Sequence, residues 1–306
     1  MVGTSVPYIE FLPKPGQARG VQIDIDPARL GLRYPIEVGL VGDAQRTLQQ
    51  LLPMLRRNPE RTFLTKAQDG MREWHEYMHR LEMVDSKPLK PQVVAGAIGR
   101  QLARDAVVIA DSGTIATWWA RHMPVQRGQF HTLSGTLASM ANGLPYAIAA
   151  QHAFPNRQVV ALVGDGGFSM LMAEFATAVK YQLPIKICVV KNDYLGMIKW
   201  EQMVFLGNPE YGVKLQPIDF TAFARACGGT GIFLDEPRNV DEAVREWLAA
   251  PGPALLEAAV DPLTAPMPGK IKAEQALHFA ESLMRGEPDA MEIAKTAFKD
   301  RVKQLV

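Results

Sequence analysis

The sequence predicts an α/β fold, namely a doubly wound parallel sheet with a smaller α/β piece in front of it. From residue 91 onward, apolar segments of strand length alternate with segments of helical period. The apolar segments are nearly continuous in hydrophobic character, which is typical of strands buried on both faces. Glycine-rich and polar clusters follow several of these segments, at the carboxyl ends of strands where ligands bind in such sheets.

The first part of the chain reads as this short α/β piece. Residues 19–27 alternate in polarity and predict a strand, and residues 37–43 predict another. Residues 44–55 predict an amphipathic helix with a leucine stripe, formed by Leu48, Leu51, Leu52 and Leu55. We therefore predict a partial domain over residues 1–56. Residues 57–90 are charged, helical in period and end near two prolines, so they predict a helical linker.

The rest of the chain predicts one ligand-binding domain over residues 91–262 and a helical tail over residues 263–306. The predicted helices are 93–103, 144–154, 168–182, 219–228 and 240–250, and the predicted strands are 106–113, 158–167, 184–193, 230–236 and 253–261. The last segment of the tail is amphipathic, with Ile293, Phe298, Val302 and Val306 roughly along one side. A helix docked on its own domain and a helix resting on a membrane surface both fit this pattern.

The composition is that of an ordinary globular protein. Of the 306 residues, 47% are hydrophobic and 21% are charged, and the formal net charge is +1. A charge so close to zero gives no electrostatic reason to expect a nucleic-acid partner. No apolar run has the length of a membrane span, and the first residues do not form a signal peptide. We expect a cytoplasmic protein in which Cys188 and Cys227 are reduced and structural.

Three polar clusters follow predicted strands, at residues 111–114, 164–167 and 192–193. Their glycines allow close approach of the backbone to a ligand and offer amide donors to phosphate. Asp165 and Asn192 supply oxygen atoms, and two such ligands together with diphosphate oxygens suit Mg²⁺. The helix predicted to start near Phe168 directs its N-terminus to the same place, which also favours an anion.

The spacing of these clusters decides between a ligand site and a simple turn. Alone, Gly-Asp-Gly-Gly is best read as a tight turn. Asp165 and Asn192 are 27 residues apart, however, which is enough for a helix and a returning strand. Both oxygens are then expected side by side at one sheet edge. A dinucleotide site is disfavoured, because no G-x-G-x-x-G follows a first strand.

Gly164-Asp165-Gly166, followed at this distance by Asn192, resembles the cofactor motif of thiamine-diphosphate-dependent decarboxylases, acetolactate synthases and pyruvate oxidases. The resemblance implies that the side chains of Asp165 and Asn192 and the carbonyl of Tyr194 bind Mg²⁺. The motif often has two successive asparagines, whereas Lys191 stands in the first position here.

The segment SGTLASMANG, residues 134–143, resembles a second part of this family's cofactor site. The resemblance implies that Met140 wedges between the two rings of the cofactor and that the Ala138 carbonyl accepts a hydrogen bond from its pyrimidine amine. It also places the diphosphate at Gly113 and Thr114. Further cofactor contacts are implied at Ser139, Gly164, Gly166, Gly167, Leu195, Gly196 and Met197. Tyr194, Met197 and Trp200 could line the substrate side or belong to the core.

Over most of the chain, the resemblance is greatest to the pyruvate oxidase and quinone-linked pyruvate dehydrogenase family. It is carried by QIDIDPARLGLRYPIEVGLVGDA, SMAN, GDGGFSMLM and KIKAEQALHF. It implies oxidative decarboxylation of pyruvate, or another 2-oxo acid, with electrons passing to FAD and then to a quinone. The FAD contacts would be Asp24, Ile25, Asp43 and Ala44, in an incomplete site. A membrane-surface role of the C-terminal helix, on the inner face, belongs to the same resemblance.

The sequence also departs from this family. The resemblance implies that the sequence begins inside the central domain and lacks the pyrimidine-binding domain, which in this family carries the glutamate that activates the cofactor. No catalytic residue can therefore be assigned in this chain. We expect the isolated chain to be inactive, and to act as a homo-oligomer or with a subunit that supplies the N-terminal half. An acetolactate synthase-like carboligase and a non-catalytic cofactor-binding fragment are the alternatives.

Residues 75–79 match the zinc-protease pattern H-E-x-x-H. Two histidines four residues apart on a helix can share a metal ion. No third ligand can be placed, and the segment lies in the predicted linker. The pattern is therefore interpreted as a solvated helix face.

Overall fold

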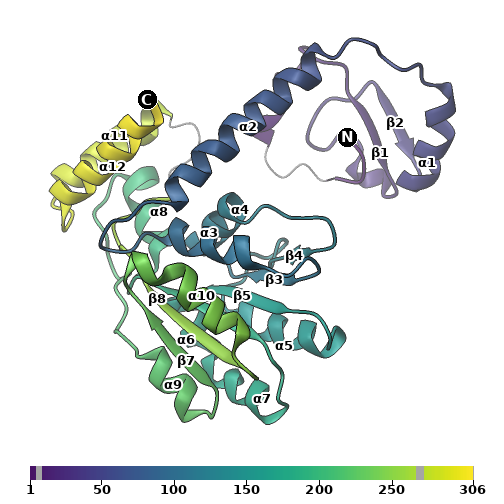
Figure 1. Cartoon of the computed structure of the whole chain (residues 1–306). Coiled ribbons are helices and arrows are strands. Elements are labelled where there is room, and N and C mark those ends of the chain that lie inside the picture. Colours follow the sequence, from purple (N-terminus) through teal and green to yellow (C-terminus); the bar gives the residue numbers. More distant parts are fainter. Residues whose placement is uncertain (5–8, 267–271, 306) are drawn as a thin grey trace. The chain divides into compact units, whose positions relative to one another are not determined.

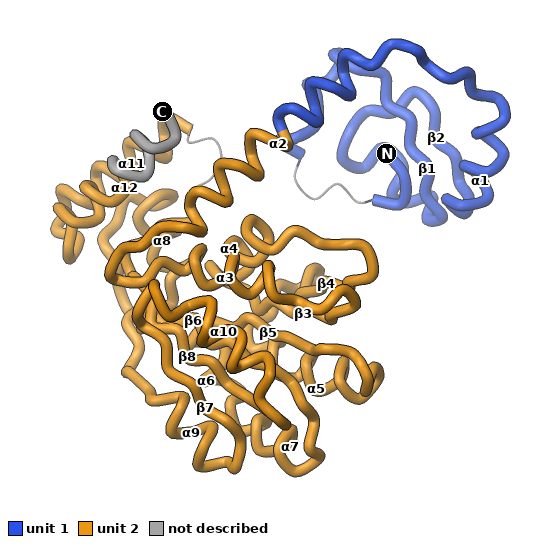
Figure 2. The backbone as a smooth tube through the Cα atoms, viewed as in Figure 1, with its two compact units in different colours: residues 1–70 blue, residues 71–306 orange. Residues whose placement is uncertain are grey.

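The computed structural model describes residues 1–4, 9–266 and 272–305. The chain divides into two compact units, residues 1–70 and 71–306, which are described separately (Figure 2). The division falls within a continuous helix, α2 (Thr62–Glu82), which occupies much of the predicted linker.

Unit 1 is built on two parallel strands, β1 (Val21–Asp24) and β2 (Val38–Val41). Helix α1 (Ala44–Leu51) follows, and the short 3₁₀ helices are η1 (Ile9–Phe11), η2 (Pro27–Arg29) and η3 (Leu52–Met54). The two predicted strands are confirmed. The helix predicted over residues 44–55 ends at Leu51 and continues into η3, and its predicted leucine stripe is exposed. All four residues of β2 are exposed as well. This unit buries little apolar surface of its own, and a two-stranded sheet alone is marginally stable.

Unit 2 contains a six-stranded sheet in which every pair of neighbouring strands is parallel (Figure 1). Its strands are β3 (Val107–Ala110), β4 (Phe130–Thr132), β5 (Val159–Gly164), β6 (Lys186–Lys191), β7 (Thr230–Leu234) and β8 (Ala254–Ala259). The spatial order is β4-β3-β5-β6-β8-β7. The chain runs from β3 outward to β4 and then returns to β5 on the other side, so the strand order reverses between β3 and β5. Ligands of open α/β sheets bind at such a switch point.

Helices cover both faces of this sheet, as predicted. One face packs on α3 (Pro91–Gln101), α4 (Thr114–His122) and α10 (Val240–Ala249), which the 3₁₀ helix η5 (Pro237–Asn239) precedes. The other packs on α5 (Gly143–Ala153), α6 (Asp165–Leu171), α7 (Phe175–Lys180) and α9 (Phe220–Ala226). Successive residues of β5 alternate between the two cores: Val160 and Leu162 enter the first, Ala161 and Val163 the second. This alternation explains the continuous apolar character of the strand.

Two features of unit 2 differ from the sequence prediction. The helix predicted over residues 168–182 is broken by a 3₁₀ turn, η4 (Met172–Glu174), where Leu171 leaves the helical region with φ −131°. Helix α4 and strand β4 were not predicted. Strand β4 has only three residues and lies at the sheet edge, so it carries almost no periodic pattern.

The tail contains α11 (Ala273–Met284) and α12 (Ala290–Leu305), and α11 packs on α8 (Gly196–Leu206). Ile293 of α12 is buried in a cluster with Trp200 and Met203 of α8. Helix α12 therefore docks on its own domain at Ile293. The other predicted positions of its stripe, the side chains of Phe298 and Val302 and residue Val306, lie outside the described residues.

The described helices include none with the length and apolar character of a membrane span. His75 and His79 of α2 are both exposed, which fits a solvated helix face. In the described ranges, no group of three or more histidine, cysteine, aspartate or glutamate side chains is arranged to hold a metal ion.

Candidate functional site

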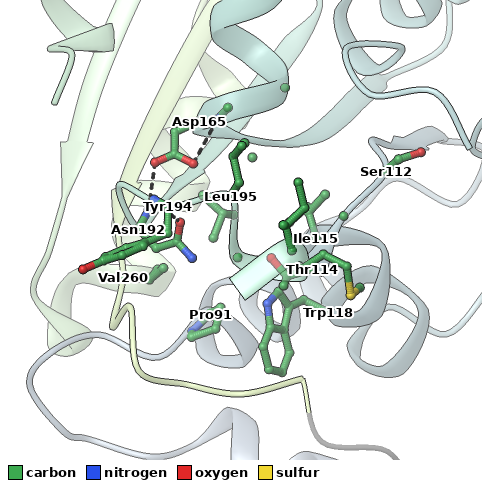
Figure 3. Close-up of a pocket in the computed structure, with 18 of the residues that line it drawn as sticks. Pro91, Ser112, Thr114, Ile115, Trp118, Asp165, Asn192, Tyr194, Leu195 and Val260 are labelled. Atoms are coloured by element: carbon green, nitrogen blue, oxygen red, sulfur yellow. Dashed lines mark hydrogen bonds between the residues drawn. The ribbon is translucent and has the colours of Figure 1, made fainter. Parts of the chain in front are cut away.

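A pocket opens at the carboxyl ends of β3, β5 and β6, where the strand order reverses (Figure 3). It gathers residues from six separate segments of the chain. Most of the residues predicted from the sequence line it: Gly113, Thr114, Met140, Gly164, Asp165, Gly166, Gly167, Asn192, Tyr194, Leu195, Gly196 and Met197. Ala138 and Ser139 are exposed and are not among the lining residues.

Asp165 lies directly after β5 and is 5% exposed. Its Oδ1 accepts a hydrogen bond from the Gly166 amide at 3.0 Å, and its Oδ2 accepts one from the Asn192 amide at 3.2 Å (Figure 3). The Asp193 amide also donates to Oδ2, at 2.6 Å. Burial nevertheless dominates and raises the pKa of this carboxyl from 3.8 to about 6. The fold thus places a poorly solvated carboxylate in the pocket, and a bound cation would stabilise its charged form.

Asn192 and Asp165 lie side by side, as the spacing predicted, because β5 and β6 are paired neighbours. Asn192 Oδ1 accepts from the Tyr194 amide at 3.1 Å, which fixes the side chain in an Asx turn. Asp193, between these residues, has φ +58°, a left-handed conformation that is costly for a residue other than glycine. The loop is therefore held in an unfavourable backbone conformation at the place where metal ligands were predicted.

Four helices begin at residues that line the pocket. Pro91 starts α3, Thr114 starts α4, Asp165 starts α6 and Gly196 starts α8. The first amides of a helix have no intrahelical acceptor, and the helix dipole adds positive potential there. Their convergence gives a site for a strongly anionic group such as a diphosphate.

Geometry requires glycine at several positions of this site, of which Gly113 and Gly166 illustrate the two reasons. Gly113 has φ +111° and ψ −160°, a conformation open essentially to glycine alone, and it forms the N-cap of α4. A Cβ on Gly166 would lie 2.7 Å from Cδ2 of Leu195, so a side chain there would displace the wall of the pocket. The glycine pattern therefore reflects close packing around the pocket as well as the turn after β5.

Met140 reaches the pocket from the loop before α5. A Cβ on Gly166 would be 3.7 Å from its Cε, which places the methionine against the turn after β5. Two residues of this loop, Ala138 and Ala141, have positive φ values of 50° and 67°. Such conformations persist only where the surroundings fix them.

Asp111 is the main residue of the site whose role the sequence did not predict. It follows β3, is fully buried, and accepts hydrogen bonds from the amides of Ser112 at 2.7 Å and Ala141 at 3.1 Å. Its neighbour along the strand, Ala110, accepts from Asn142 Nδ2 at 3.1 Å. Burial raises the pKa of Asp111. These bonds tie the end of β3 to the loop that carries Met140.

We expect Asp111→Asn to lower the free energy of unfolding of unit 2 by roughly 1–3 kcal/mol, the usual cost of leaving a buried donor without its acceptor. Chemical denaturation followed by tryptophan fluorescence measures this. Asp105→Asn is the matched control, because Asp105 is exposed just before the same strand. Equal stability of the two variants would show that Asp111 does not hold the loop.

Other lining residues were also not predicted. Trp118 lies one turn beyond Thr114 on α4, and Pro91, Val260, Asp261 and Thr264 line the pocket as well. Asp261 follows β8, the last strand of the sheet in chain order. Its position after a strand was the one sequence feature that could have indicated a place at the pocket. Trp200 is buried in the core with Met203 and does not line the pocket. Of the two roles predicted for it, the structure therefore supports the core position.

Lys191, which replaces an asparagine of the family pattern, has a structural role. Its ammonium donates to the Ile218 carbonyl at 2.9 Å and to Glu257 Oε1 at 3.2 Å. Glu257 lies on the neighbouring strand β8 and is 2% exposed. The pair balances two buried charges beside Asn192 without competing for the pocket.

The four residues predicted to contact FAD lie in unit 1. Asp43 caps α1 by accepting from the Arg46 amide at 2.9 Å, and Ala44 is the first residue of that helix. Asp24 is buried, and its Oδ2 has no hydrogen-bond partner among the described residues. Ile25 is 73% exposed. The assignment of these four residues to a flavin site stays a prediction.

Unit 2 is thus a doubly wound α/β domain with a pocket lined by helix N-termini and a buried carboxylate at its switch point. Residues 111–258 match the family model described as "Thiamine pyrophosphate enzyme, C-terminal TPP binding domain". This segment is therefore the C-terminal cofactor-binding domain of thiamine pyrophosphate-dependent enzymes. It contains all of the site residues from Asp111 to Met197 described above.

The chain is similar to several curated proteins. It is 38% identical over its whole length to the putative thiamine pyrophosphate-containing protein YdaP of Bacillus subtilis, covering 52% of that protein. A pyruvate oxidase of Lactiplantibacillus plantarum is 35% identical over 73% of this chain and 37% of its own length. Acetolactate synthase isozyme 3 large subunit of Escherichia coli is 30% identical over 74% of this chain and 40% of its own. The chain thus spans about half, or less, of the length of these relatives.

Proposed function

We propose that the pocket binds thiamine diphosphate with Mg²⁺. The observation that carries the proposal is the pairing of a buried Asp165 carboxylate, whose pKa is raised to about 6 by burial, with the Asn192 carboxamide at adjacent strand ends. With the Tyr194 carbonyl they offer three oxygen ligands, and diphosphate oxygens and water would complete the octahedral set that Mg²⁺ requires.

The chain's own residues bind and orient the cofactor. The converging starts of α4, α6 and α8, with Gly113 and Thr114, face the diphosphate. Met140 lines the pocket and would support the cofactor in a bent shape, and Asp111 holds the loop that carries Met140. When bound, thiamine diphosphate supplies a carbon nucleophile and an electron sink for decarboxylating 2-oxo acids.

The proposed reaction of the assembled enzyme is oxidative decarboxylation of pyruvate, with FAD and then a quinone as electron acceptors. The pyruvate oxidase relative and the segments resembling that family support this choice. The second candidate is acetolactate synthesis, which several relatives named acetolactate synthase at about 30% identity support. Flavin reduction by pyruvate favours the oxidase, whereas acetolactate formation without net electron transfer favours the carboligase.

Turnover is proposed to require a pyrimidine-binding domain supplied by a second polypeptide, because the 306 residues of this sequence offer no candidate for the activating glutamate. We expect no pyruvate-dependent reduction of a quinone analogue by the purified chain alone. Adding a pyrimidine-domain partner, co-expressed with the chain, should restore it. Turnover by the purified single chain would refute the need for a separate pyrimidine-binding domain.

Cofactor binding is tested separately from turnover. Calorimetric titration of the full chain with thiamine diphosphate should show binding with Mg²⁺ present and little binding with EDTA. Thiamine, which lacks the diphosphate, is the matched ligand control. Binding of thiamine and thiamine diphosphate with equal affinity, or binding independent of the metal, would contradict the proposed role of the pocket.

A further inference from the structure

A buried cluster of three charged residues lies beside the cofactor pocket and takes no part in the proposed binding. It consists of Lys199 on α8, Glu210 in the segment after α8, and Glu287 between α11 and α12, and is called here the Lys199 cluster. The Lys199 ammonium lies 2.5 Å from Glu210 Oε2 and 3.2 Å from Glu287 Oε1. The exposed fractions of the three side chains are 1%, 11% and 0%. These distances define two ion pairs. Lys199 Nζ, Glu210 Oε2 and Glu287 Oε1 have no partner among the described residues that meets the geometry of a hydrogen bond.

The cluster joins the C-terminal helices to the segment that follows α8. Glu287 contacts Lys199 through one carboxylate oxygen and accepts from the Glu210 amide at 2.7 Å through the other. Arg285, two residues earlier, donates to the Gly207 carbonyl at 3.0 Å and to Asn208 Oδ1 at 3.2 Å. The turn between α11 and α12 is therefore fixed to residues 207–210 by both charge and hydrogen bonds.

The same segment continues along the loop of the proposed metal ligands. The Leu195 amide donates to the Val213 carbonyl at 2.8 Å, and the Leu215 amide donates to the Asp193 carbonyl at 2.9 Å. Tyr194 lies between these bonds, in an antiparallel bridge with Lys214. The direction of the Tyr194 carbonyl thus depends on where residues 210–215 are held.

Lys199 also contacts the side chain of Tyr194. Its ammonium lies 4.6 Å from the centroid of the Tyr194 ring, within the range of a cation–π interaction. The ammonium can keep this position because two buried carboxylates surround it, and an unpaired buried ammonium would be strongly unfavourable. Both the ring and the main chain of Tyr194 are therefore fixed through one charged cluster.

We propose that Glu287 is a positioning residue for the cofactor pocket: through Lys199 and Glu210 it fixes the loop at Tyr194. Its effect on metal binding rests on the proposed function, whereas its effect on the loop does not. In this arrangement the turn between α11 and α12 is part of the structure of the site, although it touches no ligand.

The test compares Glu287→Gln with Glu292→Gln in the full chain. The first substitution keeps the shape of the side chain and removes its charge, and Glu292 is an exposed residue of α12. Hydrogen exchange read at the amides of Leu195 and Leu215 needs no cofactor. We expect Glu287→Gln to speed exchange at these two amides about tenfold, with little change in the interior of β5. Glu292→Gln should leave both regions as in the wild type.

Several outcomes would overturn the proposal. If exchange at Leu195 and Leu215 is unchanged, or rises equally throughout β5, the cluster only stabilises the domain. If Glu287→Gln fails to fold, the neutralised variant K199M/E210Q/E287Q leaves no unpaired buried charge in the cluster and should show the same local increase.

Titration with Mg²⁺ and thiamine diphosphate separates the two proposals. Weaker Mg²⁺-dependent binding in Glu287→Gln, by about tenfold, supports both. A wild-type chain that does not bind the cofactor refutes the proposed function, and faster local exchange would still establish the positioning of the loop. Unchanged cofactor affinity together with unchanged local exchange refutes the positioning role alone.

Discussion

Asp165→Ala is expected to abolish Mg²⁺-dependent binding of thiamine diphosphate, with at least a hundredfold loss of affinity, or about 3 kcal/mol. The side chain is the only carboxylate among the three proposed ligands, so its removal leaves the cation without a charged protein ligand. Calorimetric titration of the variant against the wild type measures the loss. Unchanged affinity would contradict the assignment of the metal site.

The same position should behave differently when stability is measured without ligand. Because burial raises the pKa of Asp165 from 3.8 to about 6, keeping it charged at pH 7 costs the folded chain about 3 kcal/mol. Asp165→Asn removes this cost while losing part of the hydrogen bonding to the Asn192 and Asp193 amides. We therefore expect Asp165→Asn to bind no cofactor and to unfold at no lower denaturant concentration than the wild type.

Asp219→Ala is a control that should lower stability without lowering cofactor affinity. Asp219 caps α9, away from the pocket, and accepts from the Ala222 amide at 2.7 Å. Loss of a helix cap costs about 1 kcal/mol of stability. Asp219→Ala should thus lower stability and leave cofactor affinity unchanged. If both variants lost affinity in proportion to stability, the effect of Asp165 would be structural.

The sequence predicted the part of the site that depends on strand ends. Asp165 and Asn192 could be placed together because each follows a continuous apolar strand, and the carboxyl ends of parallel strands share an edge. The strand order itself was not needed, since β5 and β6 are consecutive strands that also pair in space. Local pattern and short connections were sufficient here.

The parts that could not be predicted depend on contacts between distant segments. Asp111 looks like any polar residue after a strand, and its role appears only when Ala141 lies 3.1 Å away. Lys199 and Glu287 are 88 residues apart in the chain, and nothing in either local sequence indicates that both are buried. Buried ion pairs have no periodic pattern, so side-chain type alone predicts them to be exposed.

The leucine stripe predicted over residues 44–55 illustrates a different limit. The periodicity predicted a helix correctly, but it carries no information about what the stripe packs on. Leu52 is 71% exposed and Leu55 is 60% exposed. An amphipathic pattern shows that a face is suited to burial, and the partner must come from elsewhere.

Gly167→Ala should cause the largest loss of stability among the glycine substitutions at the pocket. A Cβ on Gly167 would lie 2.3 Å from Asp111 Oδ2 and 3.5 Å from the Ala141 amide. The carboxylate must move, and it then loses the hydrogen bond that fixes the Met140 loop. Overpacking together with an unsatisfied buried group is expected to cost about 3 kcal/mol.

Unit 2 can be followed by itself, because all five tryptophans of the chain lie within residues 71–306. Chemical denaturation monitored by tryptophan fluorescence therefore reports the unfolding of this unit. Gly164→Ala is the matched control: its φ of −80° suits alanine, and a Cβ there meets nothing within 4 Å. Its effect should remain within about 1 kcal/mol.

A double-mutant cycle identifies the cause of the Gly167 effect. If the new methyl group acts by displacing the Asp111 carboxylate, that clash disappears in Asp111→Ala. The double variant G167A/D111A should then lose less stability than the sum of the single variants, by about 1–2 kcal/mol. Strict additivity would mean that Gly167 is required for another reason, such as the close approach of α6 to the Met140 loop. A positive coupling would make Asp111 and Gly167 one packing unit, in which the second glycine after Asp165 leaves room for the carboxylate that holds the loop.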